Sequence, residues 1–137
     1  MASPIREMTC VRYYRDGRHW DKERVVLPSW SDVEAAVRRM DNYCFPIVHL
    51  NTTEDEEEES IFNIVGGDGR WALFQMMGEW KYTDREYQGE IDEEWLWESD
   101  QGYCCETNEL LTDVEKVLRI VRKYYDTGSY DELDTVG

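Results

Sequence analysis

The sequence predicts an α+β fold in which an antiparallel sheet of about five to seven strands carries two amphipathic helices packed on it. Short runs of alternating apolar residues are typical of strands, and tight turn sequences between them favour antiparallel neighbours. Two other segments place apolar residues at helical spacing, so each has a stripe that it must bury. The chain has 137 residues, of which 41% are hydrophobic, and we expect a single domain over residues 1–137.

The first 28 residues predict a β-hairpin. Residues 8–15 (MTCVRYYR) have the composition of a strand. Asp16-Gly17 follows, a pair favoured in two-residue turns because both positions accept a positive φ. A partner strand is expected over residues 18–27, and Pro28 ends it.

Two helices are predicted, each at a capping-box sequence. Ser31-Asp32-Val33-Glu34 lets the serine and glutamate side chains bond to each other's backbone amides, and this helix is expected to end near Asp41-Asn42. Thr112-Asp113-Val114-Glu115 is the second box, and Gly128 supplies the stop of the second helix. The apolar stripes are Val33, Ala36, Val37 and Met40 in the first helix, and Val114, Val117, Leu118, Val121 and Tyr125 in the second.

The middle of the chain predicts the remaining strands. Residues 45–50 are expected to form a strand, and the acidic run 54–59 after it a loop. Residues 61–65 and 71–77 predict a second hairpin around the turn Gly66-Gly67-Asp68-Gly69. Further strands are expected at 79–83, 93–98 and 102–106, with an acidic loop at 89–94.

Almost all of the excess charge lies in one segment. Residues 54–109 hold 18 Asp and Glu against the three bases Arg70, Lys81 and Arg85, a net −15 out of −16 for the whole chain. Such a field repels nucleic acid and anionic membranes, and it attracts a basic partner and speeds the encounter with it. The alternative is a solvated face on an ordinary domain.

Composition also argues against secretion and membrane insertion. The first 25 residues lack the apolar run of a signal peptide, and no segment approaches the roughly 18 apolar residues of a membrane helix. Of the four cysteines, Cys10 and Cys44 stand alone, whereas Cys104 and Cys105 are adjacent, an arrangement that strains a direct disulfide. We therefore expect free thiols and a cytoplasmic protein.

No pattern in the sequence indicates a catalytic or metal site. The two histidines, His19 and His49, and the scattered cysteines lack zinc-ligand spacing. There is no nucleophile elbow, and the glycine-rich residues 66–69 lack the lysine that a phosphate loop needs. Carboxylates are so abundant that a pair at catalytic spacing carries no information. We expect a protein that is not an enzyme and that uses no cofactor or metal.

The acidic segment is rich in aromatic residues, which are favoured interface anchors. Trp95 and Trp97 have the same strand parity and are expected to share one face, either a core face or an exposed face rimmed by acids. Acids on strands beside such anchors suit charge-assisted contacts. The predicted partner-binding residues are therefore Asp92, Glu93, Glu94, Trp95, Trp97, Glu98, Asp100 and Tyr103.

The acidic run 54–59 is expected to act differently. A flexible run contributes to the electrostatic field but loses entropy if it becomes ordered on binding. The residues predicted to steer the encounter, rather than to hold the partner, are Glu54, Asp55, Glu56, Glu57, Glu58 and Glu59.

The chain resembles the immunity proteins of bacterial polymorphic toxin systems, in particular the first of the numbered immunity families, which is often encoded beside nucleic-acid deaminase toxins. Trp30 with residues 31–34 is similar to the opening helix of that family, and residues 66–70 to its central hairpin. Gly102-Tyr103 with the apolar stripe after Val114 is similar to the last strand and closing helix. The tail is also similar in Thr127-Gly128 and Leu133, although the family often ends in tryptophan where this chain has Val136.

The resemblance covers roughly residues 25–137 and rests on order and spacing, because no single motif carries chemistry. It implies a small cytoplasmic α+β protein that binds one toxin domain and blocks its active site, without specifying the toxin. Together with the acidic segment, it predicts a 1:1 complex with a basic toxin domain. Two other classes stay open. One is an acidic nucleic-acid mimic that inhibits a host enzyme, which predicts acids evenly spaced along a rod. The other is a non-catalytic adaptor whose acidity only confers solubility.

Overall fold

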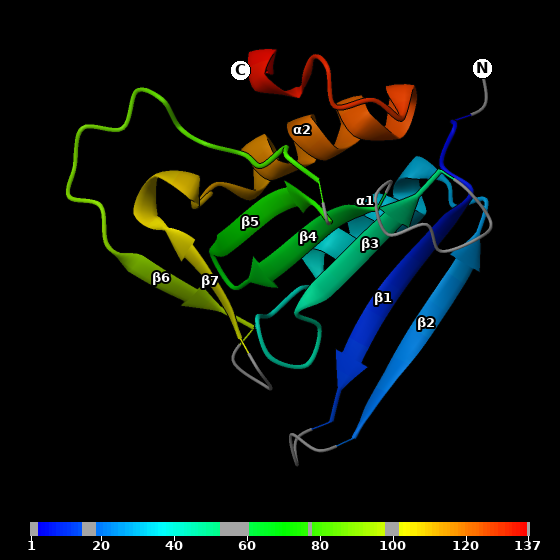
Figure 1. Ribbon diagram of the computed structural model, residues 1–137. Helices are drawn as coiled ribbons and strands as arrows, with labels where there is room; N and C mark the ends of the chain where they lie inside the picture. Colours follow the sequence, from blue (N-terminus) through cyan, green and yellow to red (C-terminus); the bar gives the residue numbers. More distant parts are fainter. Residues whose placement is uncertain (1–2, 15–18, 53–60, 77, 98–101, 137) are drawn as a thin grey trace.

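The computed structural model describes residues 3–14, 19–52, 61–76, 78–97 and 102–136. It confirms the predicted α+β class: a five-stranded antiparallel sheet of order β2-β1-β3-β4-β5, a two-stranded sheet β6-β7, and two helices (Figure 1). The elements are β1 (Glu7–Tyr13), β2 (Trp20–Val26), α1 (Trp30–Arg38), β3 (Ile47–Asn51), β4 (Phe62–Gly67), β5 (Arg70–Gln75), β6 (Glu93–Leu96), β7 (Tyr103–Glu106), α2 (Val114–Thr127) and the 3-10 turns Thr107–Glu109 and Leu133–Thr135.

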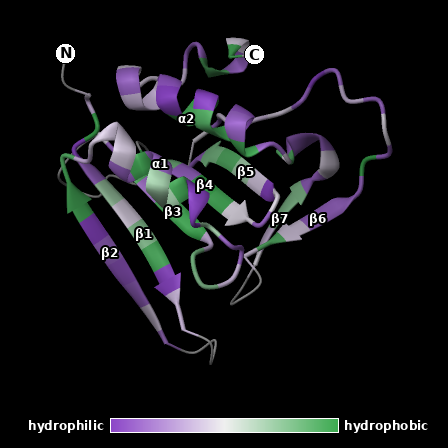
Figure 2. Cartoon of the chain, turned by 180° about the vertical axis from the view of Figure 1, so that it is seen from behind, coloured by the Kyte–Doolittle hydropathy of each residue, from purple (hydrophilic) through white to green (hydrophobic). Residues whose placement is uncertain are grey.

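The five-stranded sheet is covered on both faces. Helices α1 and α2 lie together on one face, with the polar side of α2 turned outward (Figure 2). The main core lies beneath them and consists of fully buried side chains, among them Leu50, Phe62, Val37 and Val121. A second, smaller core lies on the opposite face and contains Val11, Ile47, Val65, Ala72, Leu96 and Cys105. Strand alternation explains the division, because successive residues of each strand face opposite layers.

The central hairpin is present as predicted, but its turn is shorter than the predicted residues 66–69, because Gly66 and Gly67 belong to β4. Strands β4 and β5 pair from Phe62↔Gln75 to Gly67↔Arg70, and Asp68 and Gly69 form the turn with φ of 53° and 88°. The loop after α1 packs directly against this hairpin. A Cβ atom on Gly67 would lie 2.4 Å from the carbonyl carbon of Met40, so only glycine allows this approach.

Both helix caps differ from the predicted ones. Helix α1 is capped by Ser29, whose hydroxyl accepts from the Asp32 amide at 3.1 Å while the Asp32 carboxylate accepts from the Ser29 amide at 2.9 Å. The predicted Ser31 box is wrong. The earlier start places Trp30 in the helix, where its ring packs 5.6 Å from that of Tyr125. Helix α2 is capped by Asp113 rather than Thr112, and Gly128 ends it at a φ of 64° as predicted.

The predicted strand at residues 79–83 is also wrong. Within it only Lys81 forms an isolated bridge, to Phe74, and β5 itself ends at Gln75. The segment instead lies along the edge of β5, where Trp80 accepts from the Gln75 amide at 2.8 Å. The strands expected at 93–98 and 102–106 are present as β6 and β7, although β6 stops at Leu96. The turn Asp16-Gly17 and the run 54–59 lie outside the described residues.

Candidate protein-binding surface

The β6–β7 hairpin presents one face to the core and the other to solvent. Its pairs are Glu93↔Glu106, Glu94↔Cys105, Trp95↔Cys104 and Leu96↔Tyr103. Leu96 and Cys105 are buried on the inner side, and the Tyr103 ring stacks on Phe74 with centroids 4.6 Å apart. These contacts fix the hairpin rigidly on the second core. Its outer face consists of Glu93, Trp95, Cys104 and Glu106, all of them exposed.

Trp95 is the dominant feature of this outer face. Its side chain is 55% exposed although it is held on a paired strand. The indole lies over Gly102, where a Cβ atom would be 3.1 Å from the Trp95 Cε3 atom. The ring is therefore supported from below by backbone and open to solvent above. A large, pre-positioned aromatic side chain of this kind can bury much area on binding with little loss of rotamer freedom.

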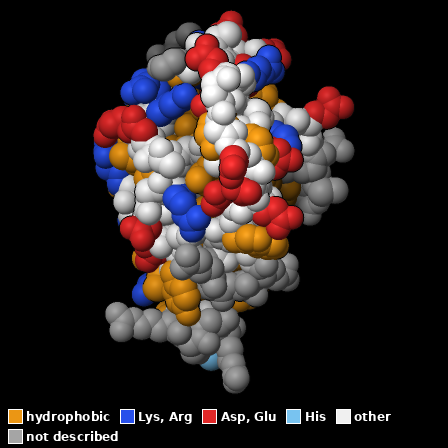
Figure 3. All heavy atoms as spheres, turned by 90° about the vertical axis from the view of Figure 1, so that its left-hand side faces the viewer, with side chains coloured by type: hydrophobic (Ala, Val, Ile, Leu, Met, Phe, Trp, Pro, Cys, Tyr) orange, Lys and Arg blue, Asp and Glu red, His pale blue; other side chains and the backbone are white. Residues whose placement is uncertain are grey.

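Two carboxylates stand beside this tryptophan and face each other. Glu93 and Glu106 are directly opposite across the hairpin, and both are exposed. Like charges at opposite positions destabilise a strand pair. Within the described ranges no Lys or Arg forms a salt bridge with either carboxylate, or with those of Glu90 and Asp92, although the charge of Glu106 contributes to the raised pKa of the nearby Lys81. Figure 3 shows acidic side chains scattered around exposed hydrophobic ones on this side of the molecule.

The predicted site residues occupy different places. Asp92 and Glu93 are exposed, and the Asp92 backbone is held by three hydrogen bonds to Thr107: its amide donates to the threonine hydroxyl at 2.9 Å, and its carbonyl accepts from the hydroxyl and the amide of Thr107, each at 3.1 Å. The Glu94 carboxylate pairs with Arg70 at 3.5 Å, so its charge is partly compensated. Tyr103 is a packing residue rather than an exposed anchor, and burial raises its pKa to about 12. Glu98 and Asp100 lie outside the described residues.

The two tryptophans do not share a face, contrary to the prediction. Strand β6 ends at Leu96, and Trp97 has a φ of 60°, which breaks the alternation. The Trp97 amide donates to the Asn42 side-chain oxygen at 2.6 Å, and its ring packs 5.9 Å from that of Tyr13. Trp97 therefore belongs to the second core, and Trp95 alone is the exposed aromatic residue of the pair.

The sequence-based prediction omitted Cys104 and Glu106, which complete the outer face. Their position follows from the register that pairs Trp95 with Cys104, and nothing in the local sequence specifies that register. Partial desolvation, and then the carboxylates of Glu93, Glu109 and Glu106, raise the pKa of Cys104, and burial raises that of Cys105 to about 11. Both thiols are protonated at neutral pH, so they are poor nucleophiles. The outer face of β6–β7 is therefore suited to binding a partner rather than to thiol chemistry.

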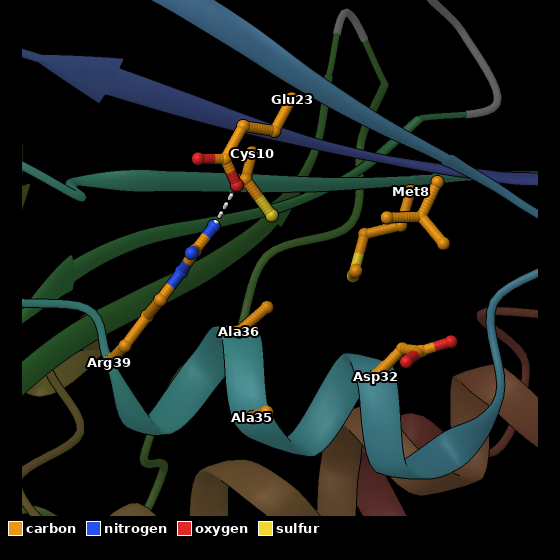
Figure 4. Close-up of a pocket in the computed structure, with 8 residues that line it drawn as sticks. Met8, Cys10, Glu23, Asp32, Ala35, Ala36 and Arg39 are labelled. Carbon is orange, nitrogen blue, oxygen red and sulfur yellow. Dashed lines mark hydrogen bonds and ion pairs between the residues drawn. The ribbon is translucent and has the colours of Figure 1, made fainter.

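A separate cleft of about 190 Å³ lies between α1 and the β1–β2 hairpin (Figure 4). Cys10 and Met8 point into it from β1, and Arg39 donates to the Glu23 carboxylate at 2.5 Å at one end. Burial raises the pKa of the Cys10 thiol, so this cleft holds no activated nucleophile. Among the described side chains, no group of three or more His, Cys, Asp or Glu could hold a metal ion.

No helix in the described part of the chain is long and apolar enough to cross a membrane. Comparisons of the chain with protein families, with curated proteins and with solved structures find no match.

Proposed function

We propose that the chain is an immunity protein, an antitoxin that binds a cognate bacterial toxin domain acting on nucleic acid, such as a deaminase, and blocks its active site. The observation that carries this proposal is the outer face of β6–β7, where the exposed Trp95 stands beside the carboxylates of Glu93 and Glu106, neither of which forms a salt bridge within the described residues. The resemblance to immunity proteins supports the same function.

The charge arrangement favours a basic partner. Glu93 and Glu106 occupy directly opposite positions of the strand pair, where like charges are unfavourable, and a Lys or Arg from a partner placed between them would compensate both charges. A toxin domain that acts on DNA or RNA needs a basic cleft for phosphates. Carboxylates on a rigid hairpin can occupy that cleft as phosphate surrogates, while Trp95 supplies the apolar anchor that phosphates lack.

The arrangement favours an immunity protein over a nucleic-acid mimic. A mimic requires acids spaced regularly along an extended surface, whereas the exposed acids of the outer β6–β7 face, Glu93 and Glu106, lie beside one exposed tryptophan on a short hairpin. An exposed tryptophan held on a paired strand favours a binding surface over a passive acidic adaptor, because tryptophan is enriched among the residues that dominate protein interfaces.

Titration calorimetry with the proposed cognate toxin domain tests the proposal. We expect a 1:1 complex with a Kd on the order of nM or below. Trp95→Ala is expected to weaken binding by about 2 kcal/mol or more, and Glu93→Gln with Glu106→Gln by a similar amount. The matched control is Trp20→Ala, because Trp20 is 52% exposed on β2, away from the β6–β7 hairpin. A Kd weaker than about 10 μM for the wild-type protein would reject the proposal.

A further inference from the structure

The two edge strands of the five-stranded sheet differ in whether other described segments bond to their outer edges. The outer edge of β5 is covered, because Trp71 and Leu111 exchange two backbone hydrogen bonds of 2.8 Å and the Tyr82 amide donates to Leu73 at 2.9 Å. The opposite edge is β2, which pairs only with β1 among the described strands (Figure 1). An open edge strand is a template for the addition of another strand.

The register identifies the backbone groups that β2 leaves open. The Leu27 amide donates to Arg6, and the Tyr14 amide donates to His19. Hydrogen-bonded pairs recur at every second residue of an antiparallel ladder, and this one is regular from Glu7↔Val26 to Tyr13↔Trp20. The odd-numbered residues of β2 therefore bond to β1, and the even-numbered ones turn their N–H and C=O groups outward. Within the described ranges, nothing bonds to the backbone of Trp20, Lys22 or Val26.

The side chains of β2 separate charge between its two faces. Asp21 and Glu23 lie on the helix side, where they bond to Tyr14 at 2.5 Å and to Arg39 at 2.5 Å. Lys22 and Arg24 lie on the opposite side, and the Lys22 ammonium is 5.9 Å from the centroid of the Trp20 ring. Trp20 and Val26, 52% and 67% exposed, stand at the two ends of this basic row.

This pattern disfavours a second copy of the chain as the occupant. A twofold antiparallel pairing of β2 with itself must place even-numbered residues opposite even-numbered ones, because those residues carry the open backbone groups. If the twofold axis passes through Lys22, the lysines of the two copies lie opposite each other. If the axis passes through Glu23, Lys22 of one copy lies opposite Arg24 of the other. A pairing centred on Val25 avoids like charges, but the overlap then runs into Pro28 just beyond the strand end. The edge is thus protected against self-pairing.

We propose that the outer edge of β2 is a docking site for an extended strand of a different protein, with acidic residues opposite Lys22 and Arg24 and basic residues opposite Asp21 and Glu23. An all-acidic strand would be repelled at long range by a chain of net charge −16. A strand that alternates acid and base is nearly neutral and still forms opposite-charge pairs on both faces. Apolar residues at its two ends would cover Trp20 and Val26.

The probe for this site is a synthetic peptide of seven residues, the length of β2. It carries glutamates opposite Lys22 and Arg24, lysines opposite Asp21 and Glu23, and valines at its ends. In nitrogen-15 NMR titrations we expect saturable binding with a Kd on the order of 100 μM, with shifts and slowed exchange at the Trp20 and Lys22 amides. The control peptide has the same composition with its glutamates adjacent and its lysines adjacent.

Variants at Lys22 separate the backbone contribution from the charge. Lys22→Pro removes one outward N–H without touching the β1 ladder and is expected to weaken binding about tenfold or more, against about threefold for Lys22→Ala. Protection of the Glu23 and Val25 amides confirms that each variant is folded. Lys22→Glu should favour a peptide with lysine at the facing position, which keeps the test valid if the proline variant fails to fold.

Three results would overturn the proposal. The first is that the matched peptide does not saturate the protein up to about 1 mM. The second is that the control peptide binds equally well. The third is that the wild-type chain sediments as a dimer and Lys22→Pro dissociates it, because a second copy would then be the occupant. None of these three measurements uses a toxin domain, so they test the β2 docking site independently of the proposed function.

Discussion

At the scale of single residues, Gly67 shows how one missing side chain positions the loop beside the candidate surface. Its φ is 126°, and a Cβ atom there would meet the backbone of Met40 and Asp41 at about 2.4–2.5 Å. The loop after α1 packs on Gly67. In this loop, the side-chain oxygen of Asn42 accepts a hydrogen bond from the amide of Trp97, which directly follows β6. A change at Gly67 therefore affects both the fold and the β6–β7 hairpin.

We expect Gly67→Ala to lower the free energy of unfolding by about 3 kcal/mol or more, because it combines an unfavourable φ with a backbone clash. The matched control is Gly69→Ala in the same turn. Gly69 also has a positive φ, 88°, but nothing lies within 4 Å of the added Cβ atom, so its cost should be only about 1 kcal/mol. Urea denaturation of the two variants measures the difference, and equal losses would contradict the close-packing argument.

Tyr103 makes the stability of the fold sensitive to alkaline pH. Burial raises its pKa from 10.0 to about 12 in the folded protein. As pH rises above 10 the unfolded chain loses this proton first, so the free energy of unfolding falls until the folded phenol ionises near 12. Cys105, raised to about 11, adds to the loss at the lower end of this range. Tyr103→Phe should reduce the decrease measured by denaturation between pH 10 and 12, and an unchanged slope would contradict the assignment.

At the scale of elements, the sequence predicted the kinds of element better than their boundaries. The β4–β5 hairpin was predictable because its glycines and its apolar runs are local signals. The start of α1 was not, because Ser29-Trp30-Ser31-Asp32 contains two serines that could each cap a helix. Packing of Trp30 on Tyr125 selects the first, and that contact joins segments far apart in the sequence.

The two serines allow a direct test of this cap. Ser29→Ala is expected to cost about 1 kcal/mol, because the Asp32 amide loses its acceptor. Ser31→Ala should change stability by less than about 0.5 kcal/mol, because Ser31 is exposed within the first turn. Thermal or urea unfolding of both variants decides between the two caps, and a larger loss for Ser31→Ala would restore the predicted box.

The residues of the candidate surface were also only partly predictable, because residue types are visible in the sequence whereas the pairing of strands is not. Acids and aromatic residues are visible in the sequence, so Glu93 and Trp95 could be named. Cys104 and Glu106 reach the same face only through the β6–β7 register, a nonlocal property. Trp97 was placed wrongly because it has a positive φ after Leu96, a conformation accompanied by a hydrogen bond that its amide donates to Asn42, a residue more than fifty positions away.

At the scale of the whole molecule, we expect net charge and local contacts to affect different steps of partner binding. The segment 54–109, which contains the β6–β7 hairpin, carries −15 of the −16 net charge, so the proposed binding surface belongs to the most acidic part of the chain. Exposed charges are screened within about 8 Å at physiological ionic strength, whereas contacts buried in a complex are screened much less. Long-range attraction should therefore set the association rate, and the contacts around Trp95 should set the dissociation rate.

Stopped-flow mixing with the toxin domain at increasing salt should show an association rate that falls steeply and a dissociation rate that changes little. Replacing all six acids of 54–59 by Gln or Asn should reduce the association rate and its salt dependence while leaving dissociation nearly unchanged, because we expect this run to contribute long-range attraction rather than fixed contacts. Glu93→Gln with Glu106→Gln is the complementary variant and should mainly speed dissociation, because these carboxylates stand on a rigid hairpin beside Trp95. If the 54–59 variant loses protection against the toxin while the hairpin variant keeps it, the interface lies on the acidic run and not on β6–β7.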